Sequence, residues 1–236
     1  MPPIRLVTPT ANRLLTNLPL QDQEQLLADC ELIQLIFDEQ LYAAGERIPH
    51  VYFPTGSFIS LVTPLDSGSG LEVGLVGDEG MLGITLILGI DVSPFQALVQ
   101  GEGPALRIPT QLFLQKLELS PTLQYQLKRY LYVSTCQLAK TAACCRIHVV
   151  EARLARWLLM TQDRAHSETF HITHIFLAYM LGVRRVGITK AASSLQRQKL
   201  IRYRRGIITI IDRIGLESAS CGCYQCDKQI YETIMK

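Results

Sequence analysis

Hydrophobic positions follow two different periods along the chain, and the change falls near residue 120. Between residues 31 and 109, short apolar runs recur with Gly, Pro, Asp or Ser between them. Several short strands at regular spacing, separated by turn signals, are typical of an all-β sandwich or barrel. The runs are 32–37, 51–53, 58–62, 71–76, 97–99 and 105–108. The leucine-rich stretch 14–29 before them predicts a short helix, and the stretch 66–70 predicts a turn.

The second period begins at residue 120 and is helical. Ser120 is a suitable N-cap, Pro121 suits the first helical position, and neither Gly nor Pro occurs from 122 to 164. Apolar residues recur there at three- and four-residue steps, so we expect one long helix, or two helices joined near 147–148. The mostly polar residues 166–171 predict a loop.

The helix that begins at residue 120 has two possible roles. Its second half contains small residues, Ala139, Ala142 and Ala143, which let a second copy of the helix approach closely. This pattern favours a dimerisation helix over residues 120–146. The alternative is an ordinary core helix that lies on the β-rich part of the chain.

Residues 172–201 carry the pattern of a helix, a glycine turn and a second helix. Thr173 is a good N-cap for the first helix, and Gly182 stands where the chain must turn sharply. Apolar positions fall on one side of the second helix and basic residues on the other. A DNA-binding helix-turn-helix needs this arrangement because its second helix enters the major groove. The next segment, 201–211, alternates around Gly206 and predicts a β-hairpin that acts as a wing.

The predicted DNA-contacting residues lie at the first N-cap, on the second helix and on the hairpin. Arg184 or Arg185 is a candidate for a bidentate bond to guanine, and Val186 for contact with a thymine methyl group. The hairpin arginines are expected to lie along phosphates. The set is Thr173, Arg184, Arg185, Val186, Thr189, Lys190, Arg197, Arg202, Arg204 and Arg205. A solvated basic helix face without a DNA partner is the alternative interpretation.

Charge is distributed unevenly along the chain. Residues 1–119 carry five Lys and Arg against fourteen Asp and Glu, whereas residues 148–215 carry twelve against four. Residues 120–147 add four basic residues and no acidic one. Because phosphates attract a basic segment and repel an acidic one, this distribution favours nucleic acid as the partner of the second half.

These features together resemble the cyclic-AMP receptor protein and fumarate-nitrate regulator (Crp/Fnr) family. The resemblance covers roughly residues 14–215, and its most specific stretches are RLARWLL at 153–159, LAYMLGVRR at 177–185 and LQRQKLIR at 195–202. It implies an N-terminal double-stranded β-helix of the cyclic-nucleotide-binding type (a β-roll), a long dimerisation helix and a C-terminal winged helix-turn-helix. It also implies a homodimer that binds a palindromic operator in double-stranded DNA, contacts RNA polymerase and senses an effector in the β-roll.

The chain departs from the cyclic-nucleotide pattern of that family at three places. The Gly-Glu-x-Gly turn of nucleotide-binding members corresponds to 80–83 without the Glu, the phosphate-binding Arg-Ser pair to 95–96, and the adenine-contacting Thr-Ser pair to 138–139. A buried cyclic phosphate without an arginine is an unpaired charge, which is costly. We therefore expect a regulator that does not depend on cyclic AMP, with another small effector as the alternative. The degenerate pocket comprises Gly80, Met81, Leu82, Gly83, Phe95, Gln96, Leu138 and Ala139.

No cofactor is predicted from this resemblance. The iron-sulfur branch of the family uses an N-terminal cysteine cluster, and Cys30 is the only cysteine before residue 136. Haem needs an axial ligand, for which His50 is a lone candidate, and a lone His near a strand is more often a surface or core residue.

The C-terminal tail contains a Cys-x-Cys-x-x-Cys motif formed by Cys221, Cys223 and Cys226. Three thiolates are a weak metal signal that needs a fourth ligand, such as His166, His171 or a partner-chain cysteine. Free thiols are the interpretation we favour, and a redox or metal sensor built on these cysteines is the alternative. The cysteines at 144–145 are interpreted as packing residues of the long helix.

The sequence lacks the motifs of common enzymes and of membrane proteins. We find no Gly-rich phosphate loop, nucleophile elbow or His-Glu zinc motif, and no apolar run reaches the roughly 18 residues of a membrane helix. Residues 1–10 lack the charged segment and apolar core of a secretory signal, and the seven cysteines are odd in number and irregularly spaced. We expect a cytoplasmic protein that is not an enzyme.

The sequence therefore predicts an α+β fold in three parts. Residues 1–119 form a β-roll sensor-like domain, residues 120–146 a dimerisation helix, and residues 147–236 a winged helix-turn-helix domain with a cysteine-containing tail. The predicted function is sequence-specific transcription regulation by a DNA-binding homodimer. The operator sequence, the sign of regulation and the effector stay open.

Overall fold

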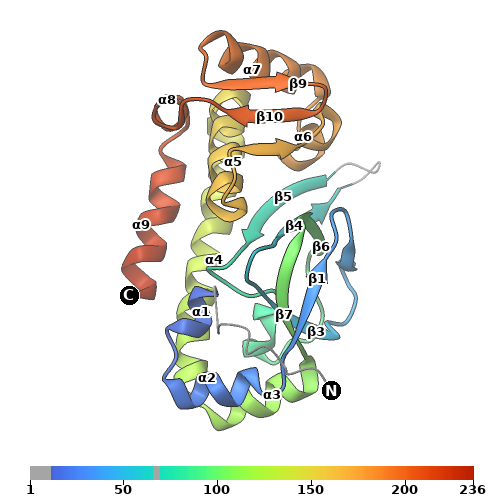
Figure 1. Ribbon diagram of the computed structural model, residues 1–236, viewed down its shortest axis with the longest axis vertical. Coiled ribbons are helices and arrows are strands. Elements are labelled where there is room, and N and C mark those ends of the chain that lie inside the picture. The colour runs from blue at the N-terminus through green and yellow to red at the C-terminus, as the bar shows by residue number, and fades with distance from the viewer. Residues whose placement is uncertain (1–11, 66–69) are drawn as a thin grey trace, which may run out of the picture.

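The computed structural model describes residues 12–65 and 70–236. A long helix, α4 (Pro121–Ile147), runs along the longest axis with the β-rich part of the chain beside it (Figure 1). The helix-turn-helix segment and its hairpin lie at the upper end in this view. The N-terminal segment 1–11 and residues 66–69 of the turn expected at 66–70 lie outside the described residues.

The β-rich part contains two antiparallel sheets. The three-stranded sheet has the order β1 (Glu31–Leu35), β7 (Gly103–Pro109), β3 (His50–Pro54). The four-stranded sheet has the order β2 (Gln40–Tyr42), β6 (Gln96–Gly101), β4 (Phe58–Pro64), β5 (Gly70–Val76). Each predicted apolar run forms one of these strands. Strand β2 was not predicted, because only Tyr42 of its three residues is buried and no alternation is visible.

Short helices close the ends of these sheets. The helix predicted over 14–29 is two helices, α1 (Arg13–Thr16) and α2 (Leu20–Leu27), which Pro19 separates as the N-cap of α2. A 3-10 helix, η2 (Ile84–Leu88), follows β5, and α3 (Thr110–Leu119) follows β7. Helix α3 was not predicted. Its buried residues are Phe113 and Leu117, too few positions to show a period.

Helix α4 begins as predicted from the sequence. The Ser120 side chain accepts a hydrogen bond from the Leu123 amide at 3.0 Å, and Pro121 occupies the first helical position. The chain is extended at His148 and Val149, and α5 (Val150–Ala165) then begins. Of the two alternatives, two helices joined near residue 148 is therefore correct.

The C-terminal part is a second compact unit with its own core. It contains α6 (His174–Leu181), α7 (Arg185–Arg197) and a sheet of order β8 (Thr169–His171), β10 (Ile207–Ile210), β9 (Ile201–Arg204). The loop predicted over 166–171 is wrong for its second half, since residues 169–171 pair with β10 and bury Phe170.

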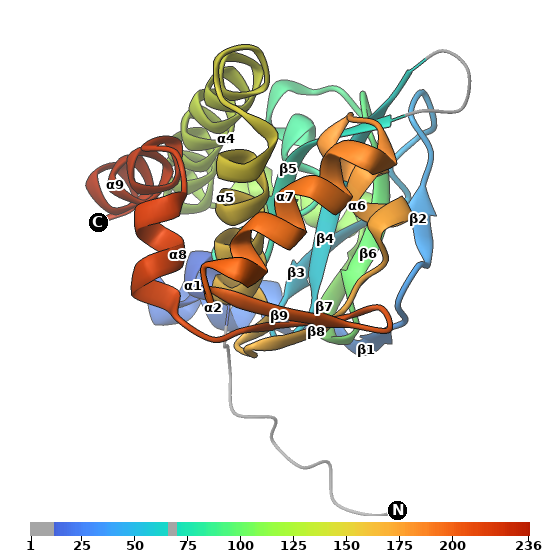
Figure 2. The same ribbon diagram turned by 90° about the horizontal axis from the view of Figure 1, so that it is seen from above.

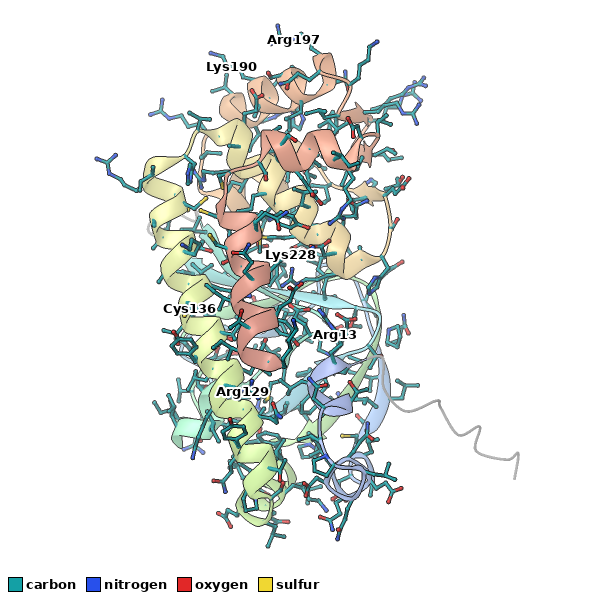
Figure 3. All side chains as sticks on the ribbon, turned by 90° about the vertical axis from the view of Figure 1, so that its left-hand side faces the viewer. Arg13, Arg129, Cys136, Lys190, Arg197 and Lys228 are labelled. Atoms are coloured by element: carbon teal, nitrogen blue, oxygen red, sulfur yellow. The ribbon has the colours of Figure 1, made fainter. Side chains whose placement is uncertain are left out.

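Two further helices, α8 (Arg213–Ala219) and α9 (Cys223–Met235), end the chain. Helix α9 lies beside α4 in both Figure 1 and Figure 3. Its last residues reach the core of the β-rich part, where Met235 is buried. None of the helices in the described ranges is long and apolar enough to span a membrane.

Candidate nucleic-acid interface

Local interactions fix both ends of α6, the first helix of the helix-turn-helix. The Thr173 hydroxyl accepts a hydrogen bond from the Phe176 amide at 3.1 Å and so begins α6 as predicted. Gly182 ends α6 in the left-handed conformation with φ of 60°. A side chain there would be strained by its backbone conformation and would press on Leu71 of β5, which explains the glycine.

Helix α7 has one buried face and one exposed face. The buried residues Ile188, Ala191, Ala192 and Leu195 belong to the C-terminal core. The opposite face is open: seen from above in Figure 2, no other element covers α7. The exposed side chains at the predicted DNA-contacting positions of this segment are Arg184, Arg185, Val186, Thr189, Lys190 and Arg197. Figure 3 shows Lys190 and Arg197 pointing outward from this end of the molecule.

The hairpin extends the same basic surface. Strands β9 and β10 pair in register and are joined by Arg205 and Gly206, both with positive φ. This is the two-residue turn that matches the twist of paired strands. Arg202, Arg204 and Arg205 are exposed.

These exposed basic residues make no ion pairs with other described residues of the chain. In the described part of the chain, no ion pair involves Arg184, Arg185, Lys190, Arg197 or the three hairpin arginines. Their charges are therefore free for an external anion, and a row of such charges suits the phosphates of DNA.

Two residues that the sequence did not single out shape this surface. His174 stacks on Tyr203 of the hairpin, with ring centroids 4.2 Å apart, and its Nδ1 lies 3.1 Å from the Thr189 hydroxyl. Burial, and then the charge of Arg185, lower the pKa of His174, so the imidazole is neutral at physiological pH. The Thr189 hydroxyl also donates to the Arg185 carbonyl at 3.1 Å, so part of its hydrogen-bonding capacity is already used within the protein.

Other arginines of the same domain are internal. Arg156 pairs with Asp227 of α9 at 2.7 Å, and Arg164 pairs with Glu79 of the β-rich part at 2.9 Å, with all four side chains largely buried. Arg153 donates to the Leu181 carbonyl at the end of α6. These side chains hold the helix-turn-helix onto α9 and the sheets rather than facing solvent.

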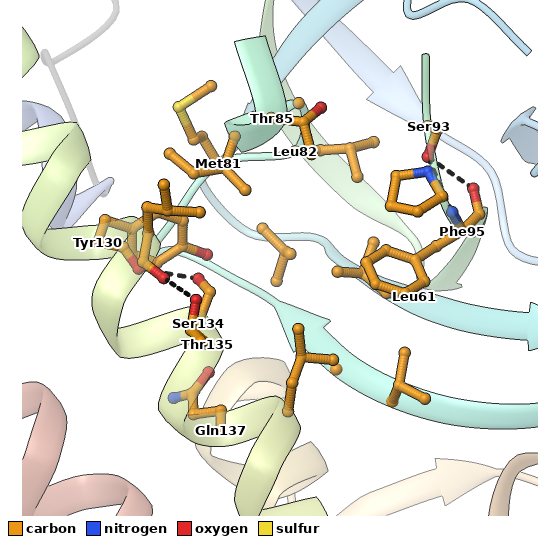
Figure 4. A pocket seen from close by; sticks show the side chains of 18 of the residues that line it. Leu61, Met81, Leu82, Thr85, Ser93, Phe95, Tyr130, Ser134, Thr135 and Gln137 are labelled. Carbon is orange, nitrogen blue, oxygen red and sulfur yellow. Dashed lines mark hydrogen bonds between the residues drawn. The ribbon is translucent and has the colours of Figure 1, made fainter. Parts of the chain in front are cut away.

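A cavity of about 200 Å³ lies between the β-rich part and α4, at the place where the effector pocket was expected (Figure 4). Five of the eight predicted pocket residues line it: Met81, Leu82, Gly83, Phe95 and Leu138. The other three, Gly80, Gln96 and Ala139, are not among its lining residues.

The three residues outside the cavity have other surroundings. A side chain at Gly80 would collide with the Tyr130 hydroxyl of α4, so this glycine permits close packing. The Gln96 amide nitrogen donates to Gln40 at 2.7 Å, and its oxygen accepts from Tyr179 of α6 at 3.4 Å. Ala139 is exposed on α4.

The cavity is uncharged. No Lys, Arg, His, Asp or Glu is found among its described lining residues. Burial raises the pKa values of Tyr42 and Tyr130, both in the lining, so both phenols stay neutral. The Thr85 hydroxyl is buried in the wall without a hydrogen-bond partner among the described residues. An apolar ligand with one polar group fits this wall better than a cyclic phosphate does.

The solvent-facing side of α4 shows a regular stripe. Exposed or half-exposed positions recur at alternating steps of three and four residues, which is the seam spacing of a parallel coiled coil. They include two large side chains, Tyr125 at 60% and Tyr132 at 57% exposure. The stripe is Tyr125, Lys128, Tyr132, Thr135, Ala139, Ala142 and Arg146.

The three cysteines of the tail motif do not form one cluster in the structure. Cys221 and Cys223 lie with Cys144 and His148, and the potential ligand atoms of these four residues are within 4.8 Å of one another. Cys226 is not part of this group, nor are His166 and His171. The motif spacing gave no sign of Cys144 or His148, because they lie more than seventy residues earlier.

Known proteins share this architecture. Residues 152–219 match the model of the Crp-like helix-turn-helix domain. A search of curated proteins finds no match. Among solved structures, the chain is similar to a transcriptional regulator of the Crp/Fnr family from Eubacterium rectale, with 16% identity over 88% of this chain and 97% of that one, at a TM-score of 0.68.

Two further structures show the same likeness. A transcriptional regulator of the CRP family from Thermus thermophilus has 18% identity over 80% of this chain and 96% of that one, at a TM-score of 0.67. The c-di-GMP responsive global regulator CLP from Xanthomonas campestris has 15% identity over 80% and 98%, at a TM-score of 0.66. At these identities the likeness shows the fold, which is the Crp/Fnr fold predicted from the sequence. The domain model matched over residues 152–219 is that of a Crp-like helix-turn-helix, and the similar structures are those of transcriptional regulators.

Proposed function

We propose that the protein is a sequence-specific DNA-binding transcription regulator that acts as a homodimer in the cytoplasm. The observation that carries the proposal is the row of exposed, unpaired basic side chains along α7 and the hairpin. It lies on the segment that matches the Crp-like helix-turn-helix domain. The proposed DNA-contacting residues are those named from the sequence, with Thr189 partly occupied by His174.

The proposed roles of the three parts of the chain follow the boundaries expected from the sequence. Residues 1–119 are the sensor-like part, residues 120–146 the dimerisation helix and residues 147–236 the DNA-binding part. The acidic first part lies away from the α7 surface, so it does not repel bound DNA at short range (Figure 1). RNA polymerase is the proposed protein partner, and we propose no enzymatic activity.

The exposed stripe on α4 supports the homodimer. Its three-four spacing and its tyrosines suit pairing with the same stripe of a second copy around a two-fold axis. Two copies related in this way would present two α7 helices about 34 Å apart, one helical turn of DNA, and read a palindrome.

Selection of bound sequences from random duplex DNA at near-physiological salt tests the proposal. Enrichment of a palindrome with half-sites one turn apart is expected without added nucleotide. The matched control is the triple variant R184A/R185A/K190A, which should enrich nothing while keeping its folded circular dichroism spectrum. No enrichment by the wild-type protein, with or without cyclic AMP, would contradict it.

A second candidate function is control by an apolar effector, and the uncharged cavity favours it. A cavity of about 150 Å³ holds benzene, so one of 200 Å³ accommodates a slightly larger molecule. Thermal unfolding with indole or cyclic AMP separates the alternatives: indole should raise the midpoint and cyclic AMP should not. Leu138→Trp fills the cavity and should abolish the indole effect. A shift with cyclic AMP alone would exclude this candidate.

A further inference from the structure

Three cysteines and one histidine meet in the interior at the junction of α4, α5 and α9. Cys144 and His148 come from the end of α4, Cys221 lies between α8 and α9, and Cys223 is the first residue of α9. Within the described residues, these four form a group whose ligand atoms lie within 4.8 Å of one another.

The spacing within each half explains how the chain brings the ligands together. Cys144 and His148 are four residues apart, so they share one face of the last turn of α4, where the His148 amide still donates to the Cys144 carbonyl. Cys221 and Cys223 flank Gly222, the N-cap of α9. Because α9 packs along α4, both pairs reach the same point.

The interatomic distances agree with the edges of a metal tetrahedron. The Cys144 and Cys221 sulfurs are 3.5 Å apart, and the Cys223 sulfur is 3.8 Å from His148 Nδ1. A tetrahedral zinc ion with ordinary bond lengths requires sulfur–sulfur edges of about 3.8 Å and sulfur–nitrogen edges of about 3.6 Å. The thiols are free and the sulfurs are too far apart for a disulfide, whose bond is about 2.05 Å long.

The surroundings are those of a structural metal site rather than of reactive thiols. All three cysteines are buried, at 1%, 6% and 7% exposure, and they form a small cluster separate from the two large cores. The Arg156 guanidinium lies nearby in the wall of a pocket shared with Cys144 and offsets part of the negative charge that three thiolates bring. Four protein ligands leave no open position, as in closed zinc sites.

We propose that Cys144, His148, Cys221 and Cys223 bind one Zn²⁺ ion in a closed Cys₃His site. The ion fastens the start of α9 to the end of α4, beside the α4–α5 junction at residues 148–149. It therefore sets the direction in which α5 and the helix-turn-helix leave α4. This site stands on its own geometry and does not rest on the proposed DNA-binding function.

The first experiment measures zinc by mass spectrometry in full-length protein purified under reducing conditions from cells grown with zinc. About one ion per chain is expected, and Cys221→Ser and Cys223→Ser should lower the content to about a tenth or less. His148→Ala is the most informative variant, because this half-buried side chain can be truncated with little cost in packing. Cys226→Ser is the matched control and should keep its zinc, since Cys226 belongs to the sequence motif but not to the cluster.

Replacement of zinc by Co²⁺ gives a second readout. Tetrahedral cobalt bound by three thiolates has intense visible and near-ultraviolet absorption, and the wild-type and Cys226→Ser proteins should both show it. Wild-type protein that binds neither ion would overturn the proposal. So would equal zinc loss in Cys226→Ser and Cys223→Ser, or full zinc retention in His148→Ala, because each result assigns the metal to another ligand set.

Discussion

Two groups of arginines in the C-terminal part of the chain, residues 147–236, differ in exposure and in partners. Those of α7 and the hairpin are exposed and without ion pairs in the described structure, whereas Arg156 and Arg164 of α5 are largely buried and each meets a carboxylate. The net charge of a segment does not distinguish the two groups. A basic segment therefore contains both a surface for an external anion and the internal bonds that support that surface.

The two groups of arginines contribute to different free energies: the internal ones to folding and the exposed ones to the binding of DNA. Truncating an internal arginine leaves a buried carboxylate without its partner, and the cost appears in folding. Truncating an exposed arginine leaves the fold unchanged, and the cost appears only when DNA is bound. Three arginine substitutions test this difference, and the ionisation of Glu72 tests the related cost of charging a buried carboxyl. They are given from the largest expected effect to the smallest.

Arg164→Met should destabilise the protein most. It leaves Glu79, whose side chain is 7% exposed, without its partner 85 residues away, and breaking such a buried pair costs about 3–5 kcal/mol. Urea unfolding measures the loss. The double variant E79Q/R164M should recover much of it, because no buried charge is then unpaired. A loss below about 1 kcal/mol in the single variant would contradict the internal role of Arg164.

Stability should fall between about pH 4.5 and pH 7 because of Glu72. Burial, which outweighs the hydrogen bond from Ser60 and the charge of Arg164, raises the pKa of this carboxyl to about 7. In that window the unfolded chain releases the proton and the folded chain keeps it. The contribution of Glu72 is thus fully present below the unfolded pKa of about 4.5 and is lost as the pH rises through 7, by roughly 3 kcal/mol.

The comparison of wild-type and Glu72→Gln proteins isolates this group from the others that titrate. Urea unfolding of both at pH 5 and pH 7.5 should show a larger loss for the wild type. Parallel losses in the two proteins would show that Glu72 ionises normally.

Arg185→Ala should weaken binding to the selected operator by about five- to 150-fold if this arginine contacts a guanine, since such a contact contributes about 1–3 kcal/mol. The free energy of unfolding should change by less than about 0.5 kcal/mol, because the side chain is exposed and unpaired. Titration with labelled operator and with variant operators measures the loss. If Arg184→Ala has the larger effect on specificity, the base contact belongs to that residue instead.

Arg204→Ala in the hairpin should have the smallest effect on DNA affinity, and the effect should be similar for all DNA sequences. A phosphate contact acts on all sequences alike, so operator and random DNA should lose affinity to a similar degree. The slope of log affinity against log salt concentration should fall by about 1. A loss confined to the operator would show that Arg204 reads bases.

Much of the fold was predictable because local patterns report which face of an element is buried. The apolar runs of β4 and β5, the caps at Ser120 and Thr173, and the turn at Gly182 depend on neighbours within a few residues. The residues of α7 that face outward followed from its helical period for the same reason. The missed elements, β2 and α3, are those with too few buried positions to show a period.

The cavity was predictable in part. Its position followed from the resemblance to a known family, and five of the eight named residues line it. Which residues lie inside it depends on how α4 packs against the sheet. Gly80 packs against Tyr130, and Gln96 bonds to Tyr179 of α6. Neither contact can be predicted from the neighbouring residues in the sequence.

The sequence by itself determined the strands of the β-rich part, the helical second half, the helix-turn-helix and the basic face of α7. The tertiary structure alone decided which arginines are internal and which cysteines meet. Arg164 and Glu79 are 85 residues apart, and Cys144 and Cys221 are 77 apart. Such pairs depend on how whole helices pack, whereas a residue's period and caps depend only on the few residues around it.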